Sequence, residues 1–592
     1  MFESILIANR GEIACRIART CRRLGIRTIA VYSDADATAR HVREADSAVR
    51  IGPSDAASSY LNADAIIQAA LATGASAIHP GYGFLSESLQ LVERCAANGI
   101  AWIGPRAEVI GRMGSKIESK RIAAAAEVPC VPGYHGDDQD PVLLLERARE
   151  IGAPLLIKAS AGGGGKGMRR VDAIDDFLPQ LDLARREAMR AFGDDRVLIE
   201  KLIERPRHLE VQLAGDHHGG LVHLFERECS IQRNYQKVIE EAPAPRLPPA
   251  VRERLLEAAV KLGRAIGYDS LGTVEFVLAE GADTPYFLEM NTRLQVEHPV
   301  TELTTGFDLV EWQIRIAQDE PLPAAQNEIV STGWAIEARI NCEDPARGHR
   351  PEFGTVGHYA EPTGPGIRTD SGIAAGSSIP SQYDSMVAKL IGHGATRAQA
   401  ADRLHDAIGR FEAGGIGTNQ ALLLAIVEHP LFRSGRLTTG FLGEAFPGGW
   451  QERAGDARGA RIAAAIAALR PHGQATSAGP TGYWQRQGGF RFMAAAGRSA
   501  TARLRVIAED GETAIALTRE GHRLRVEIDG VPAISVAAEW LSDERLRLTP
   551  HNGMPAEFLL SSTAGTTVVN HRGTRWELKV LGEVDALARV EG

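Results

Sequence analysis

Polar side chains between positions 289 and 302 combine residue types that bind metal ions with types that bind anions. Glu289 and Asn291 follow the apolar run 286–288, and alternation along a strand would place both side chains on one face. A carboxylate and an amide oxygen suit Mg²⁺, which takes few protein ligands and completes its octahedron with phosphates and water. The pair therefore predicts a metal ion that is bound together with a nucleotide.

Arg293, Gln295 and Glu297 continue the two-residue spacing and offer a guanidinium, an amide and a carboxylate. This mixture suits a small anion that is held and then deprotonated. A solvated strand edge with scattered salt bridges would explain each residue separately. It would not explain why metal-type and anion-type side chains lie next to each other.

A further carboxylate lies inside the apolar strand expected at residues 273–277. Glu275 would be costly to bury unless it is paired or bound to a metal. Glu289 on the following strand is the natural second ligand. The sequence thus predicts Glu275, Glu289 and Asn291 as the metal site.

Four consecutive glycines, Gly162 to Gly165, separate two β-prone runs between residues 155 and 171. Glycine lets backbone N–H groups close on a polyphosphate without Cβ interference, and Lys158 on the entering strand can meet its charge. The loop is not a Walker motif, because Gly-Lys-Gly replaces Gly-Lys-Ser/Thr and no helix follows at once. Together with the carboxylate strand, it predicts a lid that closes over ATP.

Composition limits the class of protein. A chain of 592 residues should divide into several domains, and 44% hydrophobic and 24% charged residues are typical of a soluble protein. The net charge of −9 argues against a nucleic-acid binder. Six scattered cysteines indicate neither a disulfide framework nor a structural zinc site. With no apolar leader or membrane-length run, we expect a cytoplasmic protein without membrane contact.

The elements at the two ends of the chain differ in class. Ser4 to Ala8 and Thr28 to Tyr32 are predicted strands around a helix that Gly25 ends, which indicates an α/β fold with a parallel sheet. Beyond Phe446, an alanine-rich helix from Ala460 to Leu469 and a Pro-Gly-Ser-Thr stretch suggest a linker. From Gly489 on, alternating segments predict a half-buried antiparallel sheet with turns at 529–530 and 552–553.

Residues 290–302, Met-Asn-Thr-Arg-Leu-Gln-Val-Glu-His-Pro-Val-Thr-Glu, resemble the signature of biotin carboxylases, the ATP-grasp enzymes that carboxylate protein-bound biotin. The segments 79–87, 226–243 and 414–419 extend the resemblance over roughly residues 1 to 445. It implies a three-part α/β biotin carboxylase followed by a β-rich domain. The expected parts are a Rossmann-like N-terminal domain (1–115), an ATP-grasp domain (116–330) with a lid at about 131–204, a C-terminal domain (331–445), a helix and linker (446–482) and an antiparallel β-rich docking domain (483–592).

The resemblance also implies roles for individual residues. The ATP-binding set is Lys116, Lys158, Gly163, Gly164, Gly165, Glu200, Lys201, Ile203, His208 and Tyr235. The bicarbonate and biotin set is Lys237, Arg293, Gln295, Val296, Arg339 and Tyr82, and the catalytic set is Arg293, Glu297, Arg339 and Lys237, with Glu297 as the base. Many members of the family have histidine where this chain has Tyr235, which puts a histidine-specific ATP contact in doubt.

The implied activity is the biotin carboxylase step of an acyl-CoA carboxylase α subunit, with ATP, Mg²⁺ (or Mn²⁺) and bicarbonate. The β-rich domain resembles the one that docks onto a carboxyltransferase β subunit in a hetero-oligomer, although a generic barrel is also possible. The chain lacks the Met-Lys-Met motif of the biotin carrier. The carrier is thus a separate protein or, as we expect, follows in a longer chain. Another ATP-grasp ligase that joins a carboxylate to an amine, or a non-catalytic assembly subunit, remains an alternative.

Overall fold

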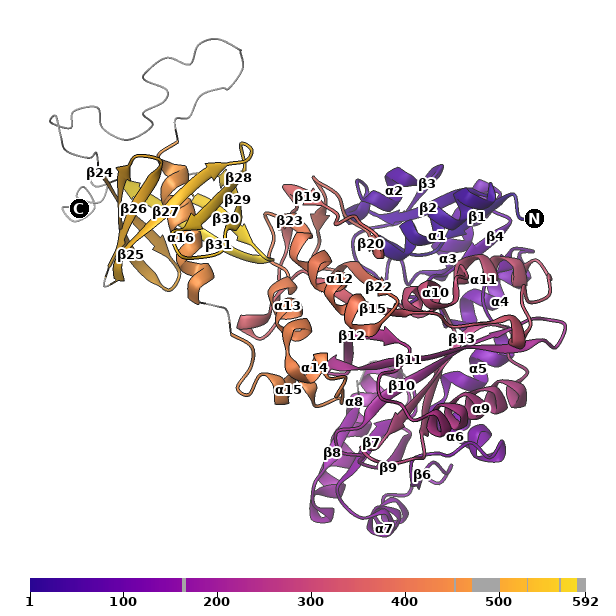
Figure 1. Ribbon diagram of the computed structural model, residues 1–592. Coiled ribbons are helices and arrows are strands. Elements are labelled where there is room, and N and C mark those ends of the chain that lie inside the picture. Colours follow the sequence, from indigo (N-terminus) through magenta and orange to yellow (C-terminus); the bar gives the residue numbers. More distant parts are fainter. Residues whose placement is uncertain (162–166, 452–453, 471–500, 530, 564–565, 583–592) are drawn as a thin grey trace, which may run out of the picture.

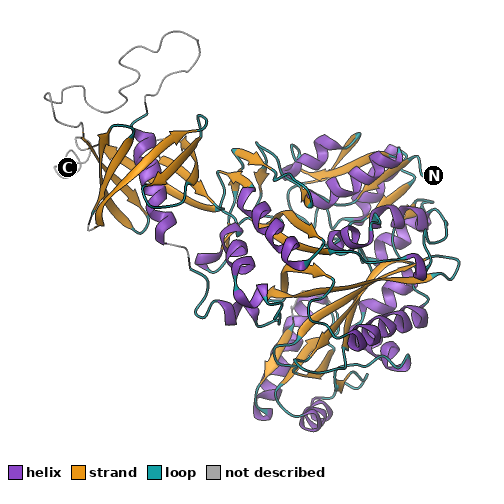
Figure 2. Cartoon of the chain, in the orientation of Figure 1, coloured by secondary structure: helices purple, strands orange, loops and turns teal. Residues whose placement is uncertain are grey.

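The computed structural model describes residues 1–161, 167–451, 454–470, 501–529, 531–563 and 566–582 (Figure 1). Its first part is a parallel sheet in the strand order β3-β2-β1-β4-β5 with helices packed against it (Figure 2). The elements are β1 (Ser4–Ile7), α1 (Gly11–Leu24), β2 (Arg27–Ser33), α2 (Arg40–Glu44), β3 (Ser47–Gly52), α3 (Ala63–Thr73), β4 (Ala77–His79), α4 (Leu89–Ala97), β5 (Ala101–Trp102) and α5 (Ala107–Gly114).

The predicted beginning of the chain is confirmed. The apolar residues of β1 are all buried, and α1 ends at Gly25, whose φ of 73° lies in the left-handed region that glycine tolerates. The β-α-β unit therefore forms for the reasons that the sequence gives: apolar strands, an amphipathic helix and a glycine cap.

A single eight-stranded sheet, in the order β14-β13-β10-β11-β12-β15-β22-β20, joins the expected ATP-grasp and C-terminal parts. The pairing of β12 with β15 connects the two. The elements outside the lid are α6 (Lys116–Ala125), β10 (Arg207–Gly215), β11 (Leu221–Arg233), β12 (Gln236–Ala242), α9 (Pro249–Ile266), β13 (Ser270–Leu278), β14 (Tyr286–Asn291), α10 (His298–Thr305), α11 (Leu309–Ala317), β15 (Trp334–Asn341), β20 (Ile367–Ser371) and β22 (Met386–Gly394).

The lid is a separate small layer. Its sheet has the order β6-β9-β7-β8, and two helices pack on it around their own apolar core. The elements are β6 (Gly133–Tyr134), α7 (Pro141–Ile151), β7 (Leu155–Ala159), β8 (Met168–Val171), α8 (Phe177–Phe192) and β9 (Val197–Lys201).

Short strands and helices complete the region before residue 446. They are β16 (Glu343–Asp344), β17 (Arg350–Pro351), β18 (Gly354–Thr355), β19 (His358–Ala360), β21 (Ser378–Ile379), α12 (Arg397–Arg410), β23 (Glu412–Gly414), α13 (Gln420–Glu428), α14 (Pro430–Arg433) and α15 (Phe441–Ala445). Their apolar side chains form one core with β15 and β22.

The C-terminal part is a closed antiparallel barrel of eight strands in sequence order, with β24 paired to β31. The elements are α16 (Ala454–Ala468), β24 (Thr501–Ala508), β25 (Gly511–Glu520), β26 (Arg523–Ile528), β27 (Val531–Trp540), β28 (Arg545–Pro550), β29 (Ala556–Thr563), β30 (Thr566–His571) and β31 (Thr574–Gly582). The predicted sheet thus closes on itself, which removes exposed strand edges. Its expected start at 483 and Gly530 of the expected 529–530 turn lie outside the described residues.

The sequence suggested that the alanine-rich helix belongs to a linker, and this prediction is wrong. Residues 460 and 462–466 of α16 are buried in one cluster with apolar residues from all eight strands (Figure 1). A helix whose middle turns are buried among strands belongs to a core, and small alanine side chains let it fit inside a narrow barrel. The helix is therefore the core of the barrel domain.

The barrel is joined to the preceding region through the turn between β30 and β31. Asn570 accepts a hydrogen bond from the Gly415 amide at 2.9 Å and donates one to the Ile416 carbonyl at 3.1 Å. The amide of Thr418 donates to the Gly573 carbonyl at 2.8 Å. Among the described residues, no helix is long and apolar enough to cross a membrane.

Candidate functional site

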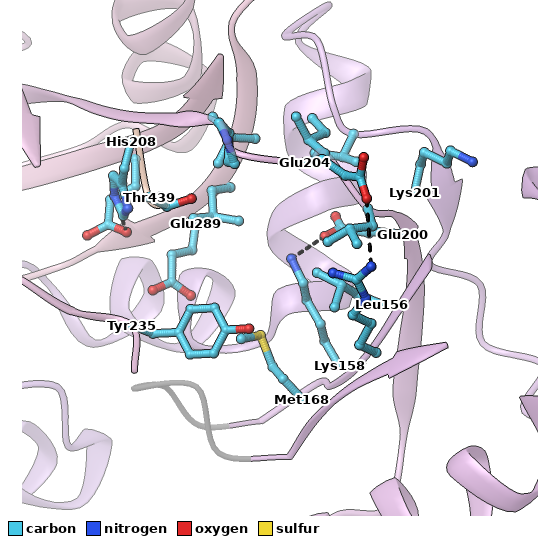
Figure 3. A pocket seen from close by; sticks show the side chains of 18 of the residues that line it. Leu156, Lys158, Met168, Glu200, Lys201, Glu204, His208, Tyr235, Glu289 and Thr439 are labelled. Atoms are coloured by element: carbon cyan, nitrogen blue, oxygen red, sulfur yellow. Dashed lines mark hydrogen bonds and ion pairs between the residues drawn. The ribbon is translucent and has the colours of Figure 1, made fainter. Parts of the chain in front are cut away.

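A cavity of about 520 Å³ lies between the lid sheet and the strands β10, β13 and β14 (Figure 3). Its lining combines an apolar portion with charged groups at one end. The predicted ATP and metal residues that line it are Lys116, Lys158, Glu200, Lys201, Ile203, His208, Tyr235, Glu275 and Glu289. Gly163, Gly164 and Gly165 of the glycine loop lie outside the described residues.

Glu200 is buried at the centre of a cluster of positive charge. Its carboxylate lies 2.5 Å from the Lys158 ammonium (Figure 3). It also lies 2.7 Å from the ammonium of Lys120. Burial alone would raise the pKa of Glu200, but the two ammonium groups outweigh it and lower the pKa to about 2. The carboxylate therefore fixes Lys158 at the cavity wall.

Tyr235 projects into the same cavity. Tyr235 and Met168 of the lid both line this cavity, and 62% of Tyr235 is exposed (Figure 3). Tyr235 has a φ of 66°, which lies in the left-handed region. The tight turn between β11 and β12 thus holds an aromatic face towards the cavity.

Glu275 and Glu289 are directly opposite each other on β13 and β14, as expected for two ligands of one ion. Asn291 donates to Glu275 Oε1 at 2.9 Å, so the three predicted metal residues are brought together. Lys116 lies 2.7 Å from Glu289 Oε2. Two carboxylates on one cavity wall with an adjacent amide fit Mg²⁺ held jointly with phosphate.

A second group of potential ligand atoms shares Glu275 with this pair. Atoms of His208, Glu210 and Glu275 all fall within 4.8 Å of one another. Lys237 Nζ lies 2.5 Å from Glu210 and 3.0 Å from Glu275, so an ammonium already neutralises these two carboxylates. Glu275 and Glu289 both line the nucleotide cavity, whereas Glu210 does not, so the Glu275–Glu289 pair fits a nucleotide-bound metal better than this group does.

Lys237 also reaches the predicted base. Its Nζ lies 2.6 Å from Glu297 Oε1, and Arg339 Nη2 donates to Glu297 Oε2 at 3.0 Å. Burial would raise the pKa of the completely buried Glu297, but Lys237 and then Arg339 outweigh it and hold the pKa well below its usual range. Glu297 is therefore ionised, with a cation on each of its oxygens.

The segment that contains Arg293, Gln295 and Val296 is not a strand continuation. β14 ends at Asn291, and a short loop leads to α10, for which Glu297 is the N-terminal cap position. The two-residue spacing after Asn291 is therefore not strand alternation.

In this loop, Arg293 donates to the side chains of Glu87 (3.0 Å), Asn291 (3.0 Å) and Gln295 (3.1 Å). It also donates to the Leu294 carbonyl at 3.3 Å. The carbonyl of Val296 accepts a hydrogen bond from Lys389 Nζ at 2.6 Å. These contacts fix the anion-binding side chains next to the metal strand.

Tyr82 approaches this loop from the N-terminal part. Its hydroxyl donates to Glu12, and Glu12 Oε1 lies 3.3 Å from the same Lys389 ammonium. The Asn9 side chain donates to the Tyr82 carbonyl at 2.8 Å and so fixes the glycine-rich turn. Tyr82 is therefore connected to the Val296 loop through Glu12 and Lys389.

Several residues that support the site were not predicted. Glu210 pairs with Lys237, Lys120 with Glu200, and Glu240 with Arg339 at 2.6 Å. Glu210 shares alternation with His208 on β10, which was a usable signal. The role of Glu240 could not be predicted without the pairing of β12 with β15, because that register sets Glu240 opposite Glu337.

Comparisons with known proteins agree with this arrangement. Residues 1–110 match the family model of the biotin carboxylase N-terminal domain, 115–325 that of the carbamoyl-phosphate synthase L chain ATP-binding domain, and 337–444 that of the biotin carboxylase C-terminal domain. The chain is 43% identical to the propionyl-CoA carboxylase alpha chain of Ruegeria pomeroyi, over 98% of this chain and 86% of that protein.

Other relatives match a shorter region. The mitochondrial methylcrotonoyl-CoA carboxylase subunit alpha of Oryza sativa subsp. japonica is 52% identical over 74% of this chain, and the match spans only 60% of the rice protein.

Solved structures match the first three quarters of the chain. The biotin carboxylase domain of Hydrogenobacter thermophilus 2-oxoglutarate carboxylase, in complex with MgADP, ADP and bicarbonate, has a TM-score of 0.73 and 46% identity over 76% of this chain and all of that one. Campylobacter jejuni biotin carboxylase, in a β-γ-ATP complex, has a TM-score of 0.73 and 42% identity over 75% of this chain and 99% of that one. The predicted three-part fold with a β-rich C-terminal domain is thereby confirmed, and the chain belongs to the biotin carboxylase family.

Proposed function

We propose that this chain carboxylates carrier-bound biotin with ATP and bicarbonate, through carboxyphosphate. The observation that carries the proposal is the position of Glu297. Its buried carboxylate lies between the cations of Lys237 and Arg339 and next to the carboxylate strands of the nucleotide cavity. A base, two anion-binding cations and a nucleotide site are the groups that this reaction needs.

Glu275 and Glu289, with Asn291 beside them, would hold Mg²⁺, which neutralises phosphate charge when it is bound. Lys116 and Lys158 line the same cavity, where they would meet the phosphates of ATP. Lys237, Arg293, Gln295 and Val296 hold bicarbonate. Positioning and charge stabilisation are the main contributions that a protein makes to phosphoryl transfer.

Bicarbonate would change the basicity of Glu297. With Lys237 and Arg339 on its two oxygens, the carboxylate is too well stabilised to be a strong base. When a bicarbonate ion pairs with these cations, less positive charge remains to stabilise the carboxylate of Glu297. The pKa of Glu297 therefore rises. Glu297 then accepts the proton of bicarbonate as the carbonate oxygen attacks the γ-phosphorus and ADP leaves.

Carboxyphosphate then breaks down to carbon dioxide and phosphate, and the phosphate takes the N1 proton of biotin. The N1 nitrogen attacks carbon dioxide and forms the carboxylated product. Arg339 stabilises the enolate-like charge on the ureido oxygen, a role suited to a fixed guanidinium. Tyr82 would face the biotin ring from the N-terminal part.

We further propose that the chain is the α subunit of an acyl-CoA carboxylase. The match to the propionyl-CoA carboxylase alpha chain extends through the barrel, which supports an assembly role for that domain. A carboxyltransferase β subunit would dock on the barrel in a hetero-oligomer, and a carrier domain would deliver biotin. The six cysteines form no disulfide, which supports a reducing compartment such as the cytoplasm.

The test is ATP hydrolysis with free biotin. We expect hydrolysis that requires bicarbonate and rises with biotin concentration. Hydrolysis that responds to amines and ignores biotin would instead indicate a carboxylate–amine ligase, and no turnover under any of these conditions would indicate a non-catalytic assembly subunit. Native mass spectrometry of the complex purified from cells would identify the β subunit.

A further inference from the structure

Two buried carboxyl groups next to Arg339 have no part in the reaction steps above. Glu240 Oε1 accepts a hydrogen bond from Arg339 Nε at 2.6 Å, while Arg339 Nη2 donates to Glu297 at 3.0 Å. The carboxylates of Glu240 and Glu297 thus occupy the Nε–Nη2 edge of the guanidinium. Within the described part of the chain, Nη1 makes no hydrogen bond, so the end of the guanidinium is left for a substrate oxygen.

Glu337 completes the arrangement from the neighbouring strand. It is the register partner of Glu240 across β12 and β15, and it lies two residues before Arg339, so all three side chains are on one face of the sheet. Glu240 and Glu337 are both completely buried. The outer oxygen of Glu240 and both oxygens of Glu337 have no hydrogen-bond partner among the described residues.

The surrounding charges do not balance two carboxylates. Lys389, Arg339, Glu240 and Glu297 are the charged groups that act most strongly on Glu337. Lys389 is directed to the Val296 carbonyl at 2.6 Å and to Glu12 at 3.3 Å, and Arg339 is shared between Glu240 and Glu297. Burying a second, unpaired negative charge beside Glu240 would be costly, so one carboxyl group should remain neutral.

We propose that Glu240 is a positioning residue for Arg339, and that Glu337 stays protonated so that no third negative charge joins those of Glu240 and Glu297 beside the guanidinium. The proposal rests on the proposed function, because it assigns Arg339 to the biotin ureido oxygen. Burial raises the pKa of both carboxyl groups, and Arg339 offsets this only in part at Glu240, which agrees with a proton held by the pair.

The kinetic test is a double-mutant cycle with free biotin as the substrate. Glu240→Gln keeps the shape and removes the charge, and misplacement of Arg339 should lower biotin-dependent kcat/KM by about 10- to 100-fold. Because Glu240 acts through Arg339, the double variant Glu240→Gln/Arg339→Ala should be no slower than Arg339→Ala alone. Losses that multiply in the double variant would overturn the proposal.

The matched control is Glu226→Gln on β11. Glu226 is also buried, also accepts from an arginine Nε (Arg252, 2.8 Å) and also has one oxygen without a partner, but it lies away from Arg339. Glu226→Gln removes a buried carboxylate, as Glu240→Gln does, but it does not disturb Arg339. It should therefore leave biotin-dependent kcat/KM within about twofold of wild type. An equal loss in both variants would make the role of Glu240 merely structural and contradict the proposal.

A structural measurement separates this proposal from the proposed function. In a crystal structure of Glu240→Gln, the guanidinium of Arg339 should rotate and its hydrogen bond to Glu297 should be lost, whether or not the protein acts on biotin. An unmoved guanidinium would overturn the positioning role. A wild-type protein that ignores biotin would instead contradict the proposed function alone.

The protonation of Glu337 has its own test. A carboxyl group that stays protonated in the folded protein ionises on unfolding, so wild type should lose stability as the pH rises, whereas glutamine does not titrate. Glu337→Gln should therefore raise the thermal unfolding midpoint relative to wild type by an amount that grows between pH 6 and pH 8. A difference between the two proteins that stays constant over this range would show that Glu337 carries a charge in the folded protein, and would overturn this part of the proposal.

Discussion

Lys237 Nζ lies 2.6 Å from Glu297 Oε1, so the cation predicted to bind the anion is ion-paired with the predicted base. The same ammonium contacts Glu210 at 2.5 Å and Glu275 at 3.0 Å. Lys237 therefore connects the base to the metal strand. A substrate anion that binds Lys237 changes the electrostatic surroundings of both.

Substituting Lys237 should affect bicarbonate far more than ATP. In Lys237→Gln we expect kcat/KM for bicarbonate to fall by about 10²–10³-fold, because a fixed cation is lost where negative charge gathers. The measurement is ATP hydrolysis against bicarbonate concentration, with ATP affinity followed by calorimetry. The exposed Lys261→Gln is the control. An unchanged bicarbonate dependence would remove Lys237 from the anion site.

Glu200 should make lid stability depend on acid pH. Its pKa of about 2 is below the ordinary value of 4.5, so its stabilisation is complete above about pH 4.5 and is lost as pH falls towards 2. Glu200→Gln should therefore lower the thermal midpoint at pH 6, by the equivalent of up to about 3 kcal/mol. The difference from wild type should shrink as the pH falls below 4.5. A difference that stays constant with pH would contradict the charge pairing, and the exposed Glu150→Gln is the control.

Tyr235 should contribute to ATP binding through its ring. Because the side chain is exposed at the cavity, Tyr235→Ala should raise the KM for ATP by about 2- to 10-fold and leave the fold intact. Tyr235→Phe retains the ring and should behave as wild type. If Tyr235→Phe loses as much affinity as Tyr235→Ala, the hydroxyl rather than the ring makes the contact.

The position of α16 predicts a packing effect inside the barrel. Ala464→Leu adds volume at a completely buried position of α16, and should destabilise the barrel by about 1–3 kcal/mol. ATP hydrolysis with free biotin should persist, because the site lies in the other part of the chain. The exposed Ala468→Leu is the control. Equal thermal midpoints for the two variants would indicate that the helix lies outside the barrel.

The sequence predicts best where local pattern decides the structure. The apolar β1 and the glycine that ends α1 give the first β-α-β unit, and the cross-strand pairing of Glu275 with Glu289 follows from two adjacent strands. The spacing at 293–297 was misleading, because the strand stops at Asn291.

Features that depend on long-range contact could not be predicted. Composition alone cannot distinguish a linker helix from one inside a barrel, because the difference lies in what surrounds the alanines of α16. The position of Glu240 opposite Glu337 depends on the register between β12 and β15, which are almost a hundred positions apart in sequence. Neither relationship produces a periodic pattern of residue types in the local sequence.

The most direct test of the account is bicarbonate- and biotin-dependent ATP hydrolysis by wild type and Glu297→Gln. Loss of the base should reduce kcat by about 10²–10⁴-fold, while the glutamine keeps the size of the side chain and ATP affinity stays near that of wild type. Equal rates in the two proteins would show that Glu297 does not deprotonate bicarbonate and would contradict the proposed chemistry.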